Sequence, residues 1–325
     1  ESLLSGTGRA LDLQTFKLVD QLSGRTLGLR ADTTPQVARI DAHLLNRSGV
    51  TRLCYCGPVL HTRPDRPFAT REPLQFGAEI YGHDGLEADL EIIELALTSL
   101  DAVALKNVSL DLSDARIVPA LLAGVSMTTD ARDALHQALA SKDLTGIQVL
   151  AKALPAPIQN ALVALVQMYG DVSVLSQAEK TFAAWPAILQ SIKELRHIAD
   201  ACKHVQVTCD LADLRGYQYH SGVMFAAYID KLPQPIARGG RYDHVGQAFG
   251  RSRPATGFSL DLLTLASLSP LNVRKQAIVA PWLDDAALNQ AIAQLRSAGE
   301  VVIQGMAGQI VEAAEYVCDR ELVKQ

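Results

Sequence analysis

Four separated clusters of polar residues stand out in this sequence, each on a predicted strand or at its end. They are Arg30-Ala-Asp32-Thr-Thr34, Arg71-Glu-Pro-Leu-Gln75-Phe-Gly-Ala-Glu79, Arg215-Gly-Tyr217-Gln-Tyr219-His220 and Gly239-Gly-Arg241-Tyr-Asp243. Gln75 and Glu79 are four residues apart, so on a strand they share one face, and their neighbours are apolar. Buried polar groups need partners, and a ligand carrying a cation and a hydrogen-bonding ring would supply them. Taken singly, each cluster is more typical of a solvated strand end.

The sequence lacks the motifs of metal, phosphate-loop and serine-nucleophile chemistry. It has no His-x-x-x-His or Cys-x-x-Cys spacing and no Gly-x-Ser-x-Gly. Cys54 and Cys56 alternate within a strand pattern and are predicted to be core residues on one face. Gly6-Thr-Gly8 follows no strand and precedes no Gly-Lys-Ser/Thr, so it is predicted to be a flexible loop. We therefore expect neither a metal nor a cofactor.

The composition is that of an ordinary globular protein with more than one packed unit. The 325 residues are 48% hydrophobic and 20% charged, and the formal net charge is −5. This charge argues mildly against a nucleic-acid partner, which usually requires a basic surplus. No apolar stretch approaches the ~20 residues of a membrane span, and no export leader opens the chain, so the expected location is the cytoplasm. Five cysteines, an odd number, favour reduced thiols there.

Short apolar runs and one long helical pattern predict an α+β core. The predicted elements are a hairpin over 16–31, a helix over 35–45, antiparallel strands around 53–60 and 74–80, a long helix over 86–105 and a strand over 108–112. Strand patterns return over 205–209, 222–229 and around Ile236, and a helix follows from about 257 to 266. We expect residues 1–112 and 205–268 to form a six- or seven-stranded, mainly antiparallel sheet flanked by helices.

Two further segments differ in pattern from this core. Residues 113–204 are rich in Ala and Leu and have helical periodicity throughout, which predicts a helical insertion with a small core of its own. Residues 272–325 have the pattern of strand, helix, strand and, from Val311 onward, a second helix. That pattern predicts a short C-terminal α/β unit. Both segments are expected to pack outside the sheet.

The four clusters, taken in order, resemble the signature motifs of class II histidyl-tRNA synthetases. The matching stretches are Leu29-Arg-Ala-Asp-Thr-Thr-Pro35, Tyr55-Cys-Gly-Pro58 through Gln75 to Glu79-Ile-Tyr-Gly82, Leu214-Arg-Gly-Tyr-Gln-Tyr-His-Ser-Gly222, and Gly239-Gly-Arg-Tyr-Asp243 with Ala255-Thr-Gly-Phe258. They are collinear from about Phe16 to Leu265, interrupted by a helical insertion where that family also has one. The resemblance implies a class II synthetase-like core followed by a truncated anticodon-binding-like segment.

The resemblance also implies that the amino-acid pocket of this family is retained. The histidine-binding residues that it implies are Asp32, Thr34, Gln75, Glu79, Arg215, Tyr219 and His220. The first three would receive the α-ammonium group, Glu79 would bond the imidazole, and Arg215 would face the carboxylate. Tyr219 would close the pocket, and His220 stands where the family has the second of two tyrosines.

The nucleotide site of the synthetases, by contrast, is degenerate in this chain. Five residues depart from the family pattern: His61, Arg63, Asp261, Leu263 and Thr264. His61 and Thr264 stand where the family has arginines that bind ATP phosphates, Arg63 and Leu263 replace acids, and Asp261 replaces a glycine. Stabilising a reacting triphosphate needs preorganised cations. We therefore predict that the adenylation of histidine has been lost.

A chain with a histidine pocket but without the phosphate-binding arginines resembles the regulatory subunits of short-form ATP phosphoribosyltransferase. This implies a non-catalytic subunit that activates the short catalytic subunit and mediates feedback inhibition by L-histidine in the first step of histidine biosynthesis. It also implies homodimers, formed through a motif expected before Glu1, within a hetero-octamer that binds neither tRNA nor a membrane. Two alternatives stay open: an active histidine–tRNA ligase and a free-standing histidine sensor.

Overall fold

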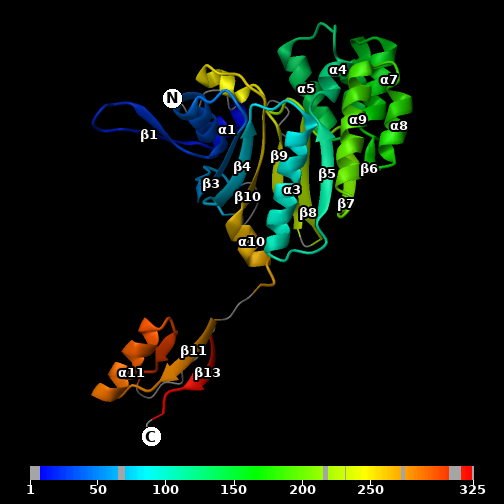
Figure 1. Cartoon of the computed structure of the whole chain (residues 1–325). Coiled ribbons are helices and arrows are strands. Elements are labelled where there is room, and N and C mark those ends of the chain that lie inside the picture. Colours follow the sequence, from blue (N-terminus) through cyan, green and yellow to red (C-terminus); the bar gives the residue numbers. More distant parts are fainter. Residues whose placement is uncertain are drawn as a thin grey trace. The chain divides into compact units, whose positions relative to one another are not determined.

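The computed structural model describes residues 8–64, 70–214, 219–230, 232–271, 275–306 and 316–323. The chain divides into two compact units, Glu1–Ser269 and Pro270–Gln325. The first unit holds a large sheet with its helices, and the second is a small α/β unit (Figure 1).

An eight-stranded sheet forms the centre of the first unit, in the order β3-β4-β10-β9-β8-β5-β7-β6. The strands are β3 (Thr51–Pro58), β4 (Leu74–Tyr81), β5 (Ser109–Asp114), β6 (Tyr169–Asp171), β7 (Gln206–Asp210), β8 (Val223–Ile229), β9 (Leu232–Arg241) and β10 (Ala255–Asp261). Neighbouring strands are antiparallel, except that β5 and β7 are parallel. The mainly antiparallel sheet confirms the predicted fold class, but it has more strands than predicted because β6 comes from the insertion.

A long amphipathic helix, α3 (Leu86–Ala102), covers one face of this sheet (Figure 1). Its Ile92 is buried in the main core together with Ile80 of β4. Because side chains alternate across a strand, Gln75 and Glu79 of β4 point to the opposite face, away from α3. That opposite face carries the polar residues singled out in the sequence.

The N-terminal elements bring the first polar cluster to the sheet. They are α1 (Gly8–Gln14), β1 (Phe16–Val19), β2 (Thr26–Leu29), α2 (Thr34–Arg39) and the π-helical η1 (Ile40–Leu45). β1 and β2 pair as an antiparallel hairpin, which confirms the hairpin predicted over 16–31. The helix predicted over 35–45 is also confirmed, although its second half is π-helical. Asp32 and Thr34 lie where the chain leaves the hairpin and enters α2, which has a proline in its first turn.

The insertion contains short helices packed on the sheet. Its helices are α4 (Ile117–Leu121), α5 (Thr129–Ala140), α6 (Leu144–Leu150), η2 (Ala151–Ala153), α7 (Ala156–Leu165), α8 (Val174–Thr181) and α9 (Pro186–Ala201). Buried residues such as Leu162 and Ile192 belong to the same continuous cluster as Leu110 of β5. The prediction of a separate small core is therefore wrong, because the apolar stripes of these helices bury themselves against the sheet. Two further helices, η3 (Val245–Phe249) and α10 (Leu262–Leu268), follow β9 and β10.

In its described residues, the second unit is a three-stranded parallel sheet with one helix. Its elements are β11 (Lys275–Ala280), α11 (Ala286–Ser297), β12 (Val302–Gln304) and β13 (Tyr316–Glu321), with the strand order β12-β11-β13. The prediction of a helix from Val311 onward is wrong for residues 316–321, which form a strand; residues 311–315 lie outside the described part. β13 completes hydrogen bonding along β11, which would otherwise be an open edge. No helix in the described residues is long and apolar enough to cross a membrane.

Cys54 and Cys56 lie on the edge strand β3 and are exposed, so the prediction that they are core residues is wrong. They do share one face of the strand, as predicted. The alternate residues Leu53 and Tyr55 are the ones that pack inward, against a second small core cluster. The alternation predicts that the two cysteines share one face of the strand, but it does not predict which face is buried.

Candidate polar site on the open face of the sheet

Glu79 is the centre of the candidate site, and its carboxylate is almost completely buried. It lies in β4, directly opposite Gly257 of β10. A Cβ atom built on Gly257 would overlap the Glu79 carboxylate. A glycine is therefore required at position 257 for the Glu79 side chain to lie flat over the neighbouring strand.

Two hydroxyl groups hold the Glu79 carboxylate in place. The Thr34 hydroxyl donates to Glu79 Oε1 at 3.1 Å, and the Tyr242 hydroxyl donates to Glu79 Oε2. Thr34 Oγ1 also lies 3.1 Å from the Tyr55 hydroxyl. The carboxylate is thus fixed by residues from three separate parts of the chain, as a preorganised recognition group requires.

Asp32 and Gln75 form the second half of this network. The Gln75 amide donates from Nε2 to Asp32 Oδ1 at 2.8 Å, and its Oε1 accepts from the backbone N–H of Thr33 at 2.9 Å. The backbone N–H of Thr34 donates to the same Asp32 oxygen at 3.0 Å. The structure therefore brings Asp32, Thr34, Gln75 and Glu79 together on the face of the sheet opposite α3, which we call the open face.

The electrostatics of the site are unusual because a carboxyl group is buried among phenols. Burial raises the pKa of Glu79 to about 8, although the hydrogen bond from Tyr242 opposes the shift, and the charge of Asp32 adds to it. Burial also raises the pKa values of Tyr55 and Tyr219 well above their usual value. The site can therefore exchange a proton with a ligand near neutral pH, while the phenols stay neutral.

Tyr219 packs against the same network, but its hydroxyl group makes no hydrogen bond within it. Its ring stacks on Tyr242 with centroids 5.0 Å apart. Its hydroxyl oxygen is buried and has no hydrogen-bond partner among the described residues. The His220 ring meets Tyr219 edge-on at 5.2 Å. Arg215, the remaining predicted ligand of histidine, lies outside the described residues.

Tyr55 and Tyr242 contribute to the site but were not among the predicted site residues. Both stand inside motifs that the sequence made conspicuous, Tyr55 ahead of Gly57-Pro58 and Tyr242 within Gly239-Gly-Arg-Tyr-Asp. The neighbouring Arg241 is instead structural: it is buried, and its Nη2 lies 2.8 Å from Asp89 Oδ2 on α3. This ion pair fixes the backbone that presents Tyr242.

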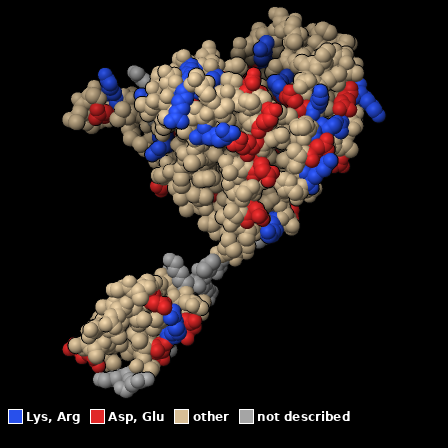
Figure 2. Space-filling model, viewed as in Figure 1, with Lys and Arg blue, Asp and Glu red and all other residues tan. Residues whose placement is uncertain are grey.

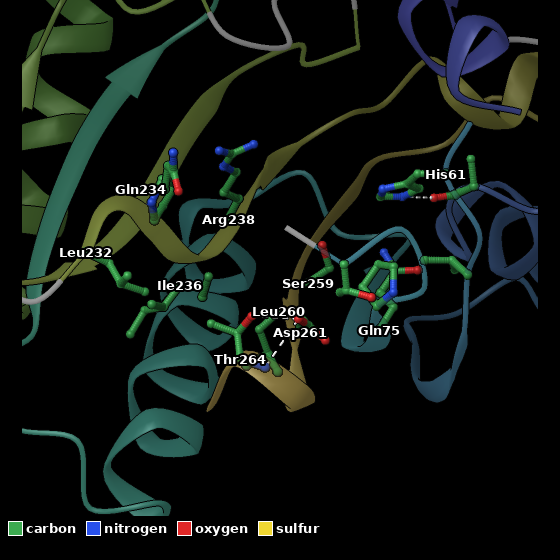
Figure 3. Close-up of a pocket in the computed structure, with 16 residues that line it drawn as sticks. His61, Gln75, Leu232, Gln234, Ile236, Arg238, Ser259, Leu260, Asp261 and Thr264 are labelled. Atoms are coloured by element: carbon green, nitrogen blue, oxygen red, sulfur yellow. Dashed lines mark hydrogen bonds between the residues drawn. The ribbon is translucent and has the colours of Figure 1, made fainter. Parts of the chain in front are cut away.

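A pocket of about 260 Å³ lies beside this network, on the same face of the sheet (Figure 3). His61, Asp261 and Thr264, three of the predicted degenerate nucleotide-site residues, line it, and so does Gln75. The other two, Arg63 and Leu263, do not line it and are both exposed.

Asp261 and His61 make contacts within the protein. Asp261 caps α10: it accepts from the backbone N–H groups of Leu263 and Thr264 at 3.2 Å, and from the Thr264 hydroxyl at 2.6 Å. It also accepts from the backbone N–H of Leu74 at 3.0 Å. His61 Nε2 lies 2.9 Å from the Ala31 carbonyl oxygen, so this ring nitrogen donates to the carbonyl. Neither side chain supplies the guanidinium that the synthetases direct at a triphosphate.

Charged side chains of both signs are interspersed over the face of the molecule that Figure 2 shows. A nucleic-acid interface would require a stripe of lysine and arginine to displace counterions. This face carries no such stripe.

Comparison with known proteins decides the family. Residues 1–265 match the family model described as histidyl-tRNA synthetase, and residues 275–325 match the one described as ATP phosphoribosyltransferase subunit HisZ C-terminal domain. The ATP phosphoribosyltransferase regulatory subunit of Polynucleobacter necessarius subsp. necessarius (strain STIR1) is 61% identical over 330 residues, covering all of this chain and 85% of that protein. The chain belongs to the family of ATP phosphoribosyltransferase regulatory subunits.

Solved structures show the same fold as this regulatory subunit. A protein from Bacillus halodurans C, described as an ATP phosphoribosyltransferase regulatory subunit/histidyl-tRNA synthetase, superposes with a TM-score of 0.79 at 25% identity, over 96% of this chain and 83% of that one. A chain of the ATP phosphoribosyl transferase (HisG:HisZ) complex from Thermotoga maritima superposes with a TM-score of 0.59 at 17% identity, over 75% of this chain and 84% of that one. These likenesses confirm the predicted class II synthetase-like fold.

Membership in the regulatory-subunit family also confirms the predicted class of function. The relatives are named as regulatory subunits, which supports a non-catalytic member of an enzyme complex in histidine biosynthesis. The synthetase-like core is therefore present in a chain whose 61% identical relative is named a regulatory subunit and not a ligase. The geometry of the two polar regions gives a physical reason for this difference.

Proposed function

We propose that the cluster around Glu79 is the histidine site through which this regulatory subunit inhibits its catalytic partner. The observation that carries the proposal is the contrast between the two regions of the open face. Asp32, Thr34, Gln75 and Glu79 converge in one preorganised network. The adjoining pocket, in contrast, has no arginine at position 61 or 264. Such a face recognises an amino acid without the means to activate it.

The proposed ligand contacts follow from the chemistry of each side chain. The oxygens of Asp32, Thr34 and Gln75 suit an α-ammonium group, because all three accept hydrogen bonds. Glu79 suits an imidazole N–H, and the buried Tyr219 hydroxyl beside it has room for one further hydrogen bond. Arg215, from outside the described residues, would face the carboxylate of histidine.

The partner would be the short ATP phosphoribosyltransferase catalytic subunit, since the Thermotoga maritima relative is described as a complex of two such proteins. We propose that this chain forms homodimers within a hetero-octamer in the cytoplasm, and that it binds no tRNA. L-Histidine would be the effector, and it would shift the complex between two states that it binds with different affinity. Activation would arise at the interface between the subunits and so would survive damage to the histidine site.

The test is a histidine titration of the reconstituted complex, following the formation of phosphoribosyl-ATP. Glu79→Ala and Gln75→Ala should each weaken inhibition by roughly ten- to a hundredfold, the effect of losing one buried charge-assisted hydrogen bond. Both variants should still stimulate the catalytic subunit. Glu72→Ala, which removes an exposed carboxylate outside the network, is the matched control. Unchanged inhibition in both site variants would place the histidine site elsewhere.

A further inference from the structure

The pocket beside the Glu79 network contains a cation that the synthetase-like motifs do not account for. Arg238 of β9 lies directly opposite Ser259 of β10, and both side chains line the pocket (Figure 3). Two residues along β10, Asp261 lies opposite Gln75 of β4. Paired and alternate residues of neighbouring strands point to the same face. The four side chains therefore form one wall on the open face of the sheet.

Arg238 is the charged group in this wall that remains available to a ligand. It is exposed and, within the described parts of the chain, its guanidinium has no carboxylate partner. Asp261, in contrast, accepts four hydrogen bonds, from three backbone N–H groups and one hydroxyl. A carboxylate has about four lone-pair positions, so the protein's own donors already occupy those of Asp261. A ligand that complements this pocket therefore carries an anionic group that binds Arg238.

Two further groups that line the pocket, Ser259 and His61, add the capacity to bind hydroxyls. The Ser259 hydroxyl is its direct neighbour across the sheet. His61 uses Nε2 for the Ala31 carbonyl, which leaves Nδ1 for a further hydrogen bond. Apolar side chains, including Val59 and Ile236, complete the lining. The pocket thus combines one cation with hydroxyl-binding groups and an apolar floor.

The size of the pocket limits the ligand. Its volume is about 260 Å³, which is at or below the lower end of the roughly 300–1,000 Å³ typical of small-molecule sites. A nucleoside triphosphate carries several charged phosphates and would need more than one cation and more room. A phosphate monoester of a small sugar matches both the volume and the single guanidinium.

We infer that this pocket binds the phosphate monoester of a small sugar. The phosphate accepts two hydrogen bonds from the planar Arg238 guanidinium, in the forked geometry that suits phosphate oxygens. The sugar hydroxyls bind Ser259 and His61. Gln75 forms the boundary with the histidine network: it is four residues from Glu79, a distance of about 13 Å along a strand. The two sites are therefore neighbours on one face but have separate ligands.

Isothermal titration of ribose 5-phosphate into the full-length protein, without histidine, tests the inference. We expect saturable binding that Arg238→Gln weakens by roughly ten- to a hundredfold, through the loss of a charge-assisted contact. Ser259→Ala should weaken it several-fold. Arg132→Gln, which removes an exposed arginine of α5 in the insertion, should bind as wild type does. Histidine titrated into Arg238→Gln should bind with unchanged affinity, which separates this site from the proposed histidine site.

Three comparison ligands make the assignment refutable. Ribose should bind far more weakly than ribose 5-phosphate, and inorganic phosphate should too. If inorganic phosphate binds as tightly as the sugar phosphate, the pocket holds an anion only and the inference is wrong. If AMP binds and ribose 5-phosphate does not, the pocket recognises a nucleotide base instead. Equal loss in Arg238→Gln and Arg132→Gln, or no saturable binding, would also overturn the inference.

Discussion

The buried carboxyl of Glu79 leads to a quantitative prediction about the pH dependence of histidine binding. In the empty site Glu79 has a pKa of about 8, so near pH 7 it is mostly protonated. The imidazole of free histidine has a pKa near 6.5, so near pH 7 it is mostly neutral. In the complex, the Glu79 carboxyl and the imidazole of histidine would share one titratable proton. Binding near pH 7 therefore requires no net exchange of protons with the solvent.

This proton count determines how the affinity for histidine changes with pH. Above pH 8 the empty site loses its proton and must recover it to bind, so the affinity falls by up to tenfold per pH unit. Below about pH 6.5 the ligand gains a second proton and must lose it, so the affinity falls again. With these two pKa values the affinity is greatest near pH 7.2 and roughly eightfold weaker at both pH 9 and pH 5.5. The titratable groups that face Glu79 are Asp32 and the phenols of Tyr55, Tyr81, Tyr219 and Tyr242.

Calorimetry in buffers of different ionisation enthalpy measures this proton balance directly. We expect no proton uptake at pH 7.2 and an uptake approaching one proton at pH 9. Glu79→Gln, which keeps the shape but cannot ionise, should lose the high-pH decline that Glu79 causes and keep the low-pH decline that the ligand causes. Any fall above pH 8 that remains in this variant belongs to the amino group of the ligand. A wild-type profile identical to that of Glu79→Gln would refute the proposed role of Glu79.

Three further predictions concern the surroundings of this site. Gly257→Ala should abolish histidine binding because its Cβ would displace the Glu79 carboxylate, and circular dichroism should show a folded protein. Arg241→Ala should lower the free energy of unfolding in urea by about 3–5 kcal/mol, since it leaves Asp89 buried without its partner; a loss below 1 kcal/mol would contradict that structural role. The purified protein should show no histidine-dependent exchange of pyrophosphate into ATP, and detectable exchange would support the alternative of an active ligase.

Much of the core could be predicted from the sequence because its side chains alternate with a clear period. The spacing of Gln75 and Glu79 placed both on one face of β4, and the structure has them on the face opposite α3. The hairpin of β1 and β2 and the helix α3 have equally regular patterns. In each case a local pattern and the burial in the fold agree.

The parts that could not be predicted depend on tertiary contacts. β6 is a three-residue strand that exists because it pairs with β7, and β13 is a strand because it pairs with β11. The prediction of a buried environment for Cys54 and Cys56 is wrong because this edge strand buries only one face, and the alternation does not say which face. The sequence indicated that Tyr242 belonged to a motif, but only the fold shows that its hydroxyl reaches Glu79.

Local rules could have shown a second role of Asp261. By its resemblance to the synthetase pattern it is only the replacement of a glycine, and in the structure it also caps α10. The helix predicted from about 257 begins only after Asp261, because residues 257–261 belong to β10. An aspartate directly before Leu262-Leu263-Thr264 is a recognisable helix N-cap.

The two regions of the open face differ in how their polar groups are satisfied, and this difference is the physical argument for a sensor. In the pocket, Asp261 and the Nε2 atom of His61 hydrogen-bond to the protein's own groups, so they stabilise the fold. Around Glu79, a carboxyl group is buried at a cost in free energy that an apolar side chain would not incur. Gly257 leaves space for that carboxyl, and the buried Tyr219 hydroxyl beside it has no partner among the described residues. An unmet hydrogen bond and a costly buried acid in one preorganised network are explained by a ligand that satisfies both.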